Sequence, residues 1–132
     1  MLGQVRRLFK NQKGVTLVEL LAVIIILGII ALIAVPAIAS VIDDSRVDSI
    51  NASAINYINA AELYKVTNDG SLPSSETDLA DYINEKDGIS FSGVTFDENT
   101  DGEITISGTG TYSGGGPSVT YSNETVSDIS DR

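Results

Sequence analysis

The sequence predicts an α+β fold, in which a long N-terminal α-helix packs against a small antiparallel β-sheet and the first half of that helix is transmembrane. Three observations lead to this prediction. Residues 20–39 are all apolar apart from one glycine and one proline. Apolar residues then recur at three- and four-residue steps from Val47 to Ala61, which is the spacing of one helical face. After residue 88, short alternating runs rich in threonine, valine and isoleucine are typical of strands.

The charge of the chain is divided sharply along its length. Of 8 basic residues, four lie in residues 1–14, whereas all 18 acidic residues lie beyond them. Loss of residues 1–14 would therefore leave 4 − 18 = −14 from side chains. Such a surface repels phosphate backbones, so direct non-specific nucleic-acid binding is not expected. The basic flank predicts a cytoplasmic N-terminus, with the acidic part outside the cell.

The residue types that are missing limit the chemistry. With no cysteine and no histidine, the chain has no disulfides, no thiolate metal sites and no histidine acid–base group. No serine lies in a nucleophile-elbow pattern. We therefore expect a protein that is not an enzyme.

Within the apolar segment, residues 15–42, the run 20–39 matches a bilayer in length. Twenty helical residues rise about 30 Å, which is the thickness of the hydrocarbon core. The segment has no amphipathic stripe, so lipid or the core of a filament must surround it on all sides. It contains two poor helix formers, Gly28 and Pro36.

A carboxylate at the inner edge of this segment is the most specific feature. The run Lys13-Gly14-Val15-Thr16-Leu17-Val18-Glu19 follows a basic leader, residues 1–14, and opens onto the apolar stretch. This arrangement resembles the class III signal of type IV pilins and pseudopilins. The resemblance implies a pilin-like fold, cleavage after Gly14 by a prepilin peptidase, and N-methylation of the new terminus at Val15. It also implies a homopolymeric helical filament, built with minor pilins on an assembly platform driven by a cytoplasmic ATPase.

Two other interpretations of the N-terminus remain open. Ala37-Ile38-Ala39 before Ser40 is an acceptable cleavage site for an ordinary secretory signal, although the apolar run is longer than such signals need. A plain single-pass anchor is the other. Neither interpretation requires Glu19 at the cytoplasmic edge.

The resemblance gives roles to four positions in the apolar segment. In a pilin filament the new amine of Val15 is thought to meet the glutamate of a neighbouring subunit, here Glu19. Two unit charges about 4 Å apart at an effective dielectric near 20 attract by roughly 4 kcal/mol before desolvation. Since an unpaired buried charge is heavily penalised, the pair would set the register of assembly. Gly28 and Pro36 either cause a mild kink or mark a segment that loses its helix in the filament.

The external part, residues 43–132, is expected to have four pieces. The helix continues through 43–67 and stops at Asn68-Asp69-Gly70. A loop and a short helix occupy 68–88, with a capped start at Ser75 and an end at Gly88. The sheet occupies 89–122, with strands at 89–96 (interrupted by Gly93), 103–107 and 118–122, and a glycine-rich loop at 108–117. Residues 123–132 are expected to be a frayed polar tail.

One acidic segment has the spacing of half an EF-hand loop. The residues that would bind calcium are Asp97, Asn99, Asp101 and the carbonyl of Glu103. The terminal bidentate glutamate is missing, because Gly108 stands at its position. A hairpin turn that ends in Asp-Gly is the favoured interpretation, and calcium is the alternative. No other cofactor is expected.

The function expected from the sequence is that of a structural subunit. The precursor would be a single-pass membrane protein, and the assembled product a filament on the cell surface that serves adhesion, motility or DNA uptake. The missing cysteines and the Val-Thr-Leu-Val-Glu start resemble competence-type pilins of Gram-positive bacteria. A pseudopilin of a type II secretion system is the near alternative. A secreted or anchored acidic, calcium-dependent binding domain is the alternative from another class.

Overall fold

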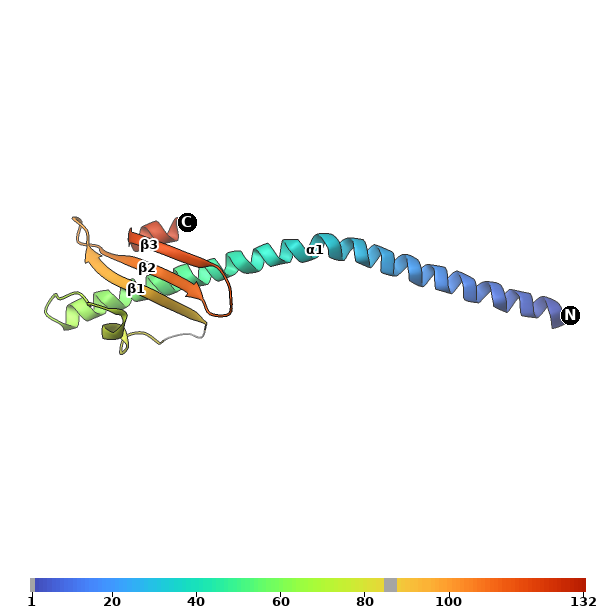
Figure 1. Cartoon of the computed structure of the whole chain (residues 1–132), viewed down its shortest axis with the longest axis horizontal. Helices are drawn as coiled ribbons and strands as arrows, with labels where there is room; N and C mark the ends of the chain where they lie inside the picture. Colours follow the sequence, from blue (N-terminus) through green and yellow to red (C-terminus); the bar gives the residue numbers. More distant parts are fainter. Residues whose placement is uncertain (1, 85–87) are drawn as a thin grey trace. The chain divides into compact units, whose positions relative to one another are not determined.

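The computed structural model describes the backbone of residues 2–84 and 88–132, and the side chains of residues 15–84 and 88–132 (Figure 1). The chain divides into two compact units, Met1–Val41 and Ile42–Arg132, which are described separately. The elements in chain order are helix α1 (Leu2–Thr67), the short 3-10 helix η1 (Glu76–Leu79), strands β1 (Ile89–Glu98), β2 (Ile104–Tyr112) and β3 (Ser118–Glu124), and helix α2 (Val126–Ser130).

The first unit is helical. Helix α1 begins at Leu2, so its backbone runs without a break through the predicted leader and across the peptide bond between Gly14 and Val15. It also continues through Pro36. The predicted apolar helix of residues 15–42 is therefore present, and it is preceded by further helix.

In the second unit, α1 contributes the central face of the core. Ile50, Ala54, Tyr57, Ile58 and Ala61 are all buried, at 6% exposure or less. These residues follow the three- and four-residue spacing of the sequence, so the predicted amphipathic helix is confirmed.

The helix ends where the sequence indicated. Thr67 is its last residue, and the backbone N–H of Gly70 donates to the carbonyl of Lys65 at 2.9 Å. Asp69 and Gly70 both have positive φ, at 52° and 84°. This left-handed exit is typical of helix C-termini and suits glycine.

The sheet has three antiparallel strands in the order β1-β2-β3. Its core face presents Phe91, Phe96, Ile106, Val119 and Tyr121, each 8% exposed or less. Together with the helix face of α1 these side chains form one hydrophobic cluster. The predicted combination of helix and small antiparallel sheet, a pilin-like α+β architecture, is confirmed.

Two strand predictions need correction. The interruption at Gly93 is an irregularity in register between Ser92 and Thr95 within the single strand β1. The predicted loop 108–117 is wrong over its first half, since β2 extends to Tyr112. Glycines in β2 are tolerated there because packing requires them: a Cβ on Gly110 would lie 2.5 Å from Cγ2 of Ile50 and 2.8 Å from Cε1 of Phe91.

The segment that connects helix and sheet is less helical than predicted. Asp78 accepts hydrogen bonds from the backbone N–H groups of Ser74 (2.8 Å) and Ser75 (3.3 Å), so the helix start at Ser75 is right. However, η1 ends at Leu79, which is fully buried, rather than at Gly88. One turn is enough to bury Leu79, while Leu72 and Ile83 on either side of it are partly buried and pack against the core. The part of the prediction that covers residues 85–87 lies outside the described residues.

The predicted frayed tail is wrong, because residues 126–130 form α2. Thr125 is the N-cap: its backbone N–H and side-chain hydroxyl donate to Oδ2 of Asp128 at 2.9 and 2.8 Å. Ile129 is 2% exposed and belongs to the hydrophobic cluster. A capped turn with a buried apolar anchor therefore holds a segment whose composition is mostly polar.

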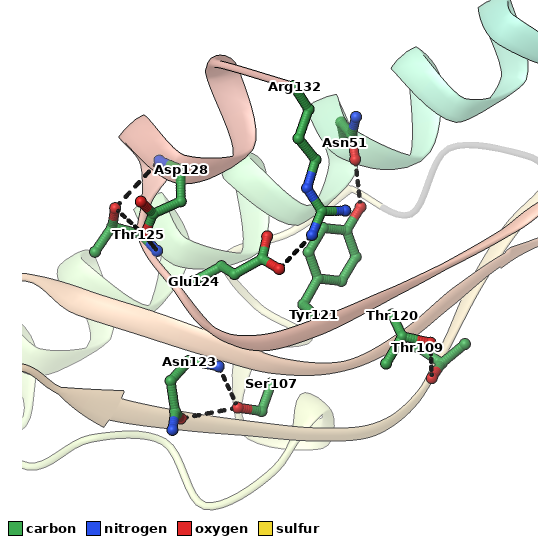
Figure 2. A network of polar contacts seen from close by, with 10 residues as sticks. All are labelled: Asn51, Ser107, Thr109, Thr120, Tyr121, Asn123, Glu124, Thr125, Asp128 and Arg132. Carbon is green, nitrogen blue, oxygen red and sulfur yellow. Dashed lines mark hydrogen bonds and ion pairs between the residues drawn. The ribbon is translucent and has the colours of Figure 1, made fainter.

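Contacts on the helix side of the sheet also hold this segment. We call the set formed by Arg132, Glu124, Tyr121 and Asn51 the Arg132 clamp. Arg132 forms an ion pair with Glu124, and its guanidinium carbon lies 5.4 Å from the centre of the Tyr121 ring (Figure 2). The Tyr121 hydroxyl in turn donates to Oδ1 of Asn51 on α1, at 2.8 Å. Burial raises the pKa of Tyr121 to about 12, so this hydroxyl remains a donor at physiological pH. The clamp thus connects the end of the chain to β3 and to α1.

We expect Gly110→Ala to destabilise the external unit by about 1–3 kcal/mol, because the new methyl group overpacks the core against Ile50 and Phe91. Urea unfolding of the full-length protein in detergent measures this loss. Gly116→Ala is the matched control, since its nearest contact, Cβ of Tyr112, lies at 3.1 Å and it too lacks a positive φ. Equal stability of the two variants would contradict the packing described here.

The cap of α2 predicts a pH dependence. The backbone and side-chain hydrogen bonds from Thr125 lower the pKa of Asp128 below its ordinary value. The stability that they give is therefore complete above the ordinary aspartate pKa, and it is lost as the pH falls through the lower folded-state pKa. We expect the protection factors of the amide hydrogens in residues 126–130, which correct for the intrinsic pH dependence of exchange, to fall over that acid range. Asp128→Asn should lower them already at neutral pH, whereas Asp81→Asn, at an exposed position, should not.

Candidate functional site

The candidate functional site is the start of the apolar helix, where Val15 and Glu19 lie four residues apart. Both positions are in α1, and both side chains are exposed within this chain, Val15 to 57%. Residues at this separation lie on the same face of a helix. The nitrogen of Val15 is here a peptide nitrogen inside the helix, and it becomes an amine only if the bond after Gly14 is cut. Gly14 itself has helical backbone, and its surroundings lie outside the described side chains.

The apolar surface that follows is uncovered by the rest of the described chain. From Val15 to Ile42, the large apolar side chains are exposed to between 46% and 78%. Covering one such side chain is worth about 1.5–3 kcal/mol. Of the described helices, α1 alone is long and apolar enough to cross a membrane. The segment therefore needs an apolar environment supplied from outside the chain.

Within residues 15–42, Glu19 is the only charged residue. A carboxylate at the centre of a bilayer costs about 2.5–3.5 kcal/mol on insertion scales, and its cost falls toward the interface. Near the first turn of the apolar segment it stays close to the membrane surface. A position deeper in an apolar assembly would require a cation beside it.

The structure keeps Gly28 and Pro36 in continuous helix. A Cβ on Gly28 would meet nothing within 4 Å, so packing within this chain does not explain the glycine. Pro36 has no N–H, which leaves the carbonyl of Leu32 without its usual helical partner. The hydroxyl of Ser40 donates to the carbonyl of Ala37 at 2.9 Å, and it thereby supports the turn after the proline. Loss of helix between Gly28 and Pro36 in a filament stays a prediction.

The acidic segment at residues 97–103 covers the end of β1 and the turn that joins it to β2. Oδ1 of Asn99 accepts hydrogen bonds from the backbone N–H groups of Asp101 (3.0 Å) and Glu103 (2.9 Å). Nδ2 of Asn99 donates to the carboxylate of Glu103 at 3.0 Å, and the carbonyl of Glu103 accepts from the N–H of Asn99 at 2.9 Å. Gly102 supplies a positive φ of 83°. Two of the four predicted calcium-binding oxygens thus hold the turn together.

The other two candidate calcium ligands, Asp97 and Asp101, do not form a cluster with the oxygens of Asn99 and Glu103. Asp97 and Asp101 are exposed, and the backbone carbonyl of Asp97 accepts from the hydroxyl of Thr105 at 3.3 Å. Among the residues whose side chains are described, no three acidic groups are arranged to hold a metal ion. The geometry is that of a hydrogen-bonded hairpin turn, and calcium binding here stays a prediction.

Comparison with known proteins assigns the N-terminal region. Residues 9–35 match the family model of the prokaryotic N-terminal methylation motif. This range includes the predicted cleavage bond, Glu19 and most of the apolar segment. Over the rest of the chain the comparisons give no family, because no curated protein and no solved structure matches it. The motif is the class III signal of type IV pilins, so the N-terminal region of this chain is similar to that of type IV pilin-like and pseudopilin precursors.

Proposed function

We propose that this chain is the structural subunit of a type IV pilus or pilus-like filament. A prepilin peptidase cuts the precursor after Gly14, the new terminus at Val15 is methylated, and subunits polymerise through their apolar helices. The observation that carries the proposal is the methylation motif at residues 9–35 on a helix whose apolar side chains are exposed on every side.

The apolar surface allows the subunit to move from one apolar environment to another. In the precursor, lipid covers residues 15–42, and in the filament the helices of neighbouring subunits cover them. Since both environments are apolar, the exchange costs little per side chain, and subunits can leave the bilayer when an external motor moves them. We propose a cytoplasmic ATPase acting through an assembly platform as that motor.

Glu19 supplies the register. Cleavage creates a cationic amine at Val15, and one subunit's amine pairs with the carboxylate of the next. At an effective dielectric near 20, charges about 4 Å apart attract by roughly 4 kcal/mol before desolvation. A stagger that left the carboxylate unpaired in the apolar core would lose about 3–5 kcal/mol. The difference favours one register over all others.

The acidic external unit limits how filaments contact other molecules. With −14 from side chains in the mature chain, neighbouring filaments and nucleic acids are repelled at low salt. Adhesion, motility, DNA uptake and, for a secretion pseudopilin, extrusion of substrate all use the same polymer. The methylation motif is common to these systems and does not favour one of them.

Mapping the mature N-terminus tests the processing step. We expect mass spectrometry of the membrane-associated protein to find an N-methylated Val15. Gly14→Val should leave the precursor uncut, whereas Gly28→Val, the same change farther along the helix, should be processed normally. A mature chain that begins at Ser40 would instead support an ordinary secretory signal.

Replacement of Glu19 tests the register. We expect Glu19→Ala to insert into the membrane and to be processed, but to form few or no filaments by electron microscopy. Asp43→Ala is the matched control, because it removes a carboxylate from the same helix just beyond the apolar segment. Normal filaments from Glu19→Ala would contradict the register role while leaving the processing step intact.

Calcium at the β1–β2 turn is a separate prediction from the sequence, and it is tested by chelation. If calcium contributes to the fold, EDTA should lower the melting temperature of the wild type and not that of Asp101→Ala. Because Asn99 already closes the turn, we expect Asn99→Ala to cost about 1 kcal/mol with or without calcium. An unchanged melting temperature on chelation of the wild type would remove calcium from the site.

A further inference from the structure

Helix α1 runs through the peptide bond at which the proposed processing takes place. Its backbone is helical from Leu2 to Thr67, so Gly14 and Val15 lie inside the helix and not at its end (Figure 1). In an α-helix the carbonyl of Gly14 accepts a hydrogen bond from the N–H of Val18, and the peptide group is enclosed by the neighbouring turns. A water molecule therefore reaches the carbonyl carbon of Gly14 only when the helix opens locally.

The residue before the bond favours such an opening. Helix α1 contains three glycines, Gly3, Gly14 and Gly28, and glycine is a much poorer helix former than alanine. Gly3 lies in the first turn, far from the bond. Gly28 lies within the apolar run 20–39, where lipid offers no hydrogen bonds to opened backbone groups. Of the three, Gly14 alone is inside the helix and outside the apolar run.

Water can reach the backbone at Gly14 once it opens. Gly14 precedes residue 20, where the wholly apolar run begins, by about 9 Å along the helix. Lys13, directly before it, is charged, and lysines at the ends of apolar segments extend to the membrane surface. The N–H and C=O groups that opening releases near Gly14 can therefore bind water. The next two residues, Val15 and Thr16, are β-branched and add little helix propensity of their own.

We propose that the bond after Gly14 is hydrolysed only from a locally unwound form of α1, and that Gly14 controls processing by setting the population of this form. The inference deepens the processing step of the proposed function and rests on it. In that step water adds to the carbonyl carbon of Gly14, and the C–N bond breaks. The oxygen of the water stays in the new carboxylate of Gly14, and both of its protons go to the nitrogen of Val15, which becomes an ammonium group.

The population of the unwound form scales the rate of cutting. When unwinding is fast compared with hydrolysis, the observed rate is the rate from the unwound form multiplied by its fraction. Gly14→Ala stabilises the helix by the difference in propensity between alanine and glycine, so the fraction and the rate should fall about four- to fivefold. Gln12→Gly weakens the helix close to the bond and should raise both about two- to threefold.

The test measures cutting rates and amide hydrogen exchange on the full-length precursor in lipid nanodiscs. The enzyme is a purified prepilin peptidase that cuts another type IV prepilin under the same conditions. Gly14→Ala, which adds only one methyl group, should be cut about four- to fivefold more slowly than the wild type, and Gly14→Ala/Gln12→Gly should regain about two- to threefold of that loss. On the uncut precursors, the protection factors of the amides in residues 14–18 should rise and fall by the same factors.

The matched control is Gly14→Ala/Gln4→Gly, which makes the same second change in the same helix but away from the bond. It should be cut as slowly as Gly14→Ala. Equal rates for the wild type and Gly14→Ala would overturn the proposal. So would a slow Gly14→Ala that Gln12→Gly does not rescue, because the added methyl group would then obstruct the peptidase without acting through the helix. Equal rescue by Gln4→Gly would also overturn it, since the opening would not be local.

Failure of the proposed function gives a different result. If the peptidase cuts the other prepilin but never the wild-type chain, the processing step of the proposed function is wrong. The exchange measurement does not depend on cutting. Protection factors at residues 14–18 that stay the same in Gly14→Ala would overturn the inference by themselves, because Gly14 would then not set the population of the unwound form.

Discussion

The constraint on which the molecule depends is the uncovered apolar surface of residues 15–42, with one carboxylate at its inner end. Within the described residues its large apolar side chains stay exposed, since the second unit uses its apolar residues in its own core. The segment therefore needs an apolar environment from outside the chain, which is lipid in the precursor and other subunits in the filament that we propose. Glu19 restricts where the segment can lie, because an apolar environment tolerates the carboxylate only at the interface or beside a cation. A helix that is a membrane anchor in one state and an assembly surface in the other satisfies both conditions.

Much of the fold could be predicted because its signals are local. The spacing of Ile50, Ala54 and Ala61 placed one face of α1 in the core, and Asp69-Gly70 marked its end. The error in the length of strand β2 has a non-local cause. At Gly110, Ile50 and Phe91 occupy the space that a side chain would need, and at Gly108 a Cβ would lie 3.2 Å from the backbone of β1, whereas strand propensity alone argues against glycine there. Helix α2 is hard to predict because its composition is mostly polar, although Thr125 and Asp128 form a recognisable capping pair and Ile129 is a buried apolar anchor.

The candidate site likewise has features that the sequence predicts and features that it does not. The roles of Gly14, Val15 and Glu19 rest on a contiguous pattern, and comparison with the methylation motif supports the pattern as a whole. The turn at Asn99 was ambiguous in sequence, because the residues that would bind a cation also close a hairpin. In the structure the side-chain oxygen of Asn99 is directed at two backbone N–H groups. The contact between Tyr121 and Asn51 could not be foreseen, since the two residues are far apart in the chain and neither belongs to a motif.

The Arg132 clamp has a consequence for where this protein can work. With no cysteine in the chain, the end of the external unit is fastened by an ion pair, a stacked guanidinium and a phenol hydroxyl rather than by a covalent bridge. Such a fastening forms without an oxidant and does not depend on the redox state of its surroundings. Its sensitivity is to ionic strength instead, because salt weakens a partly exposed pair. Salinity, rather than redox state, is then the environmental variable that loosens this end of the subunit.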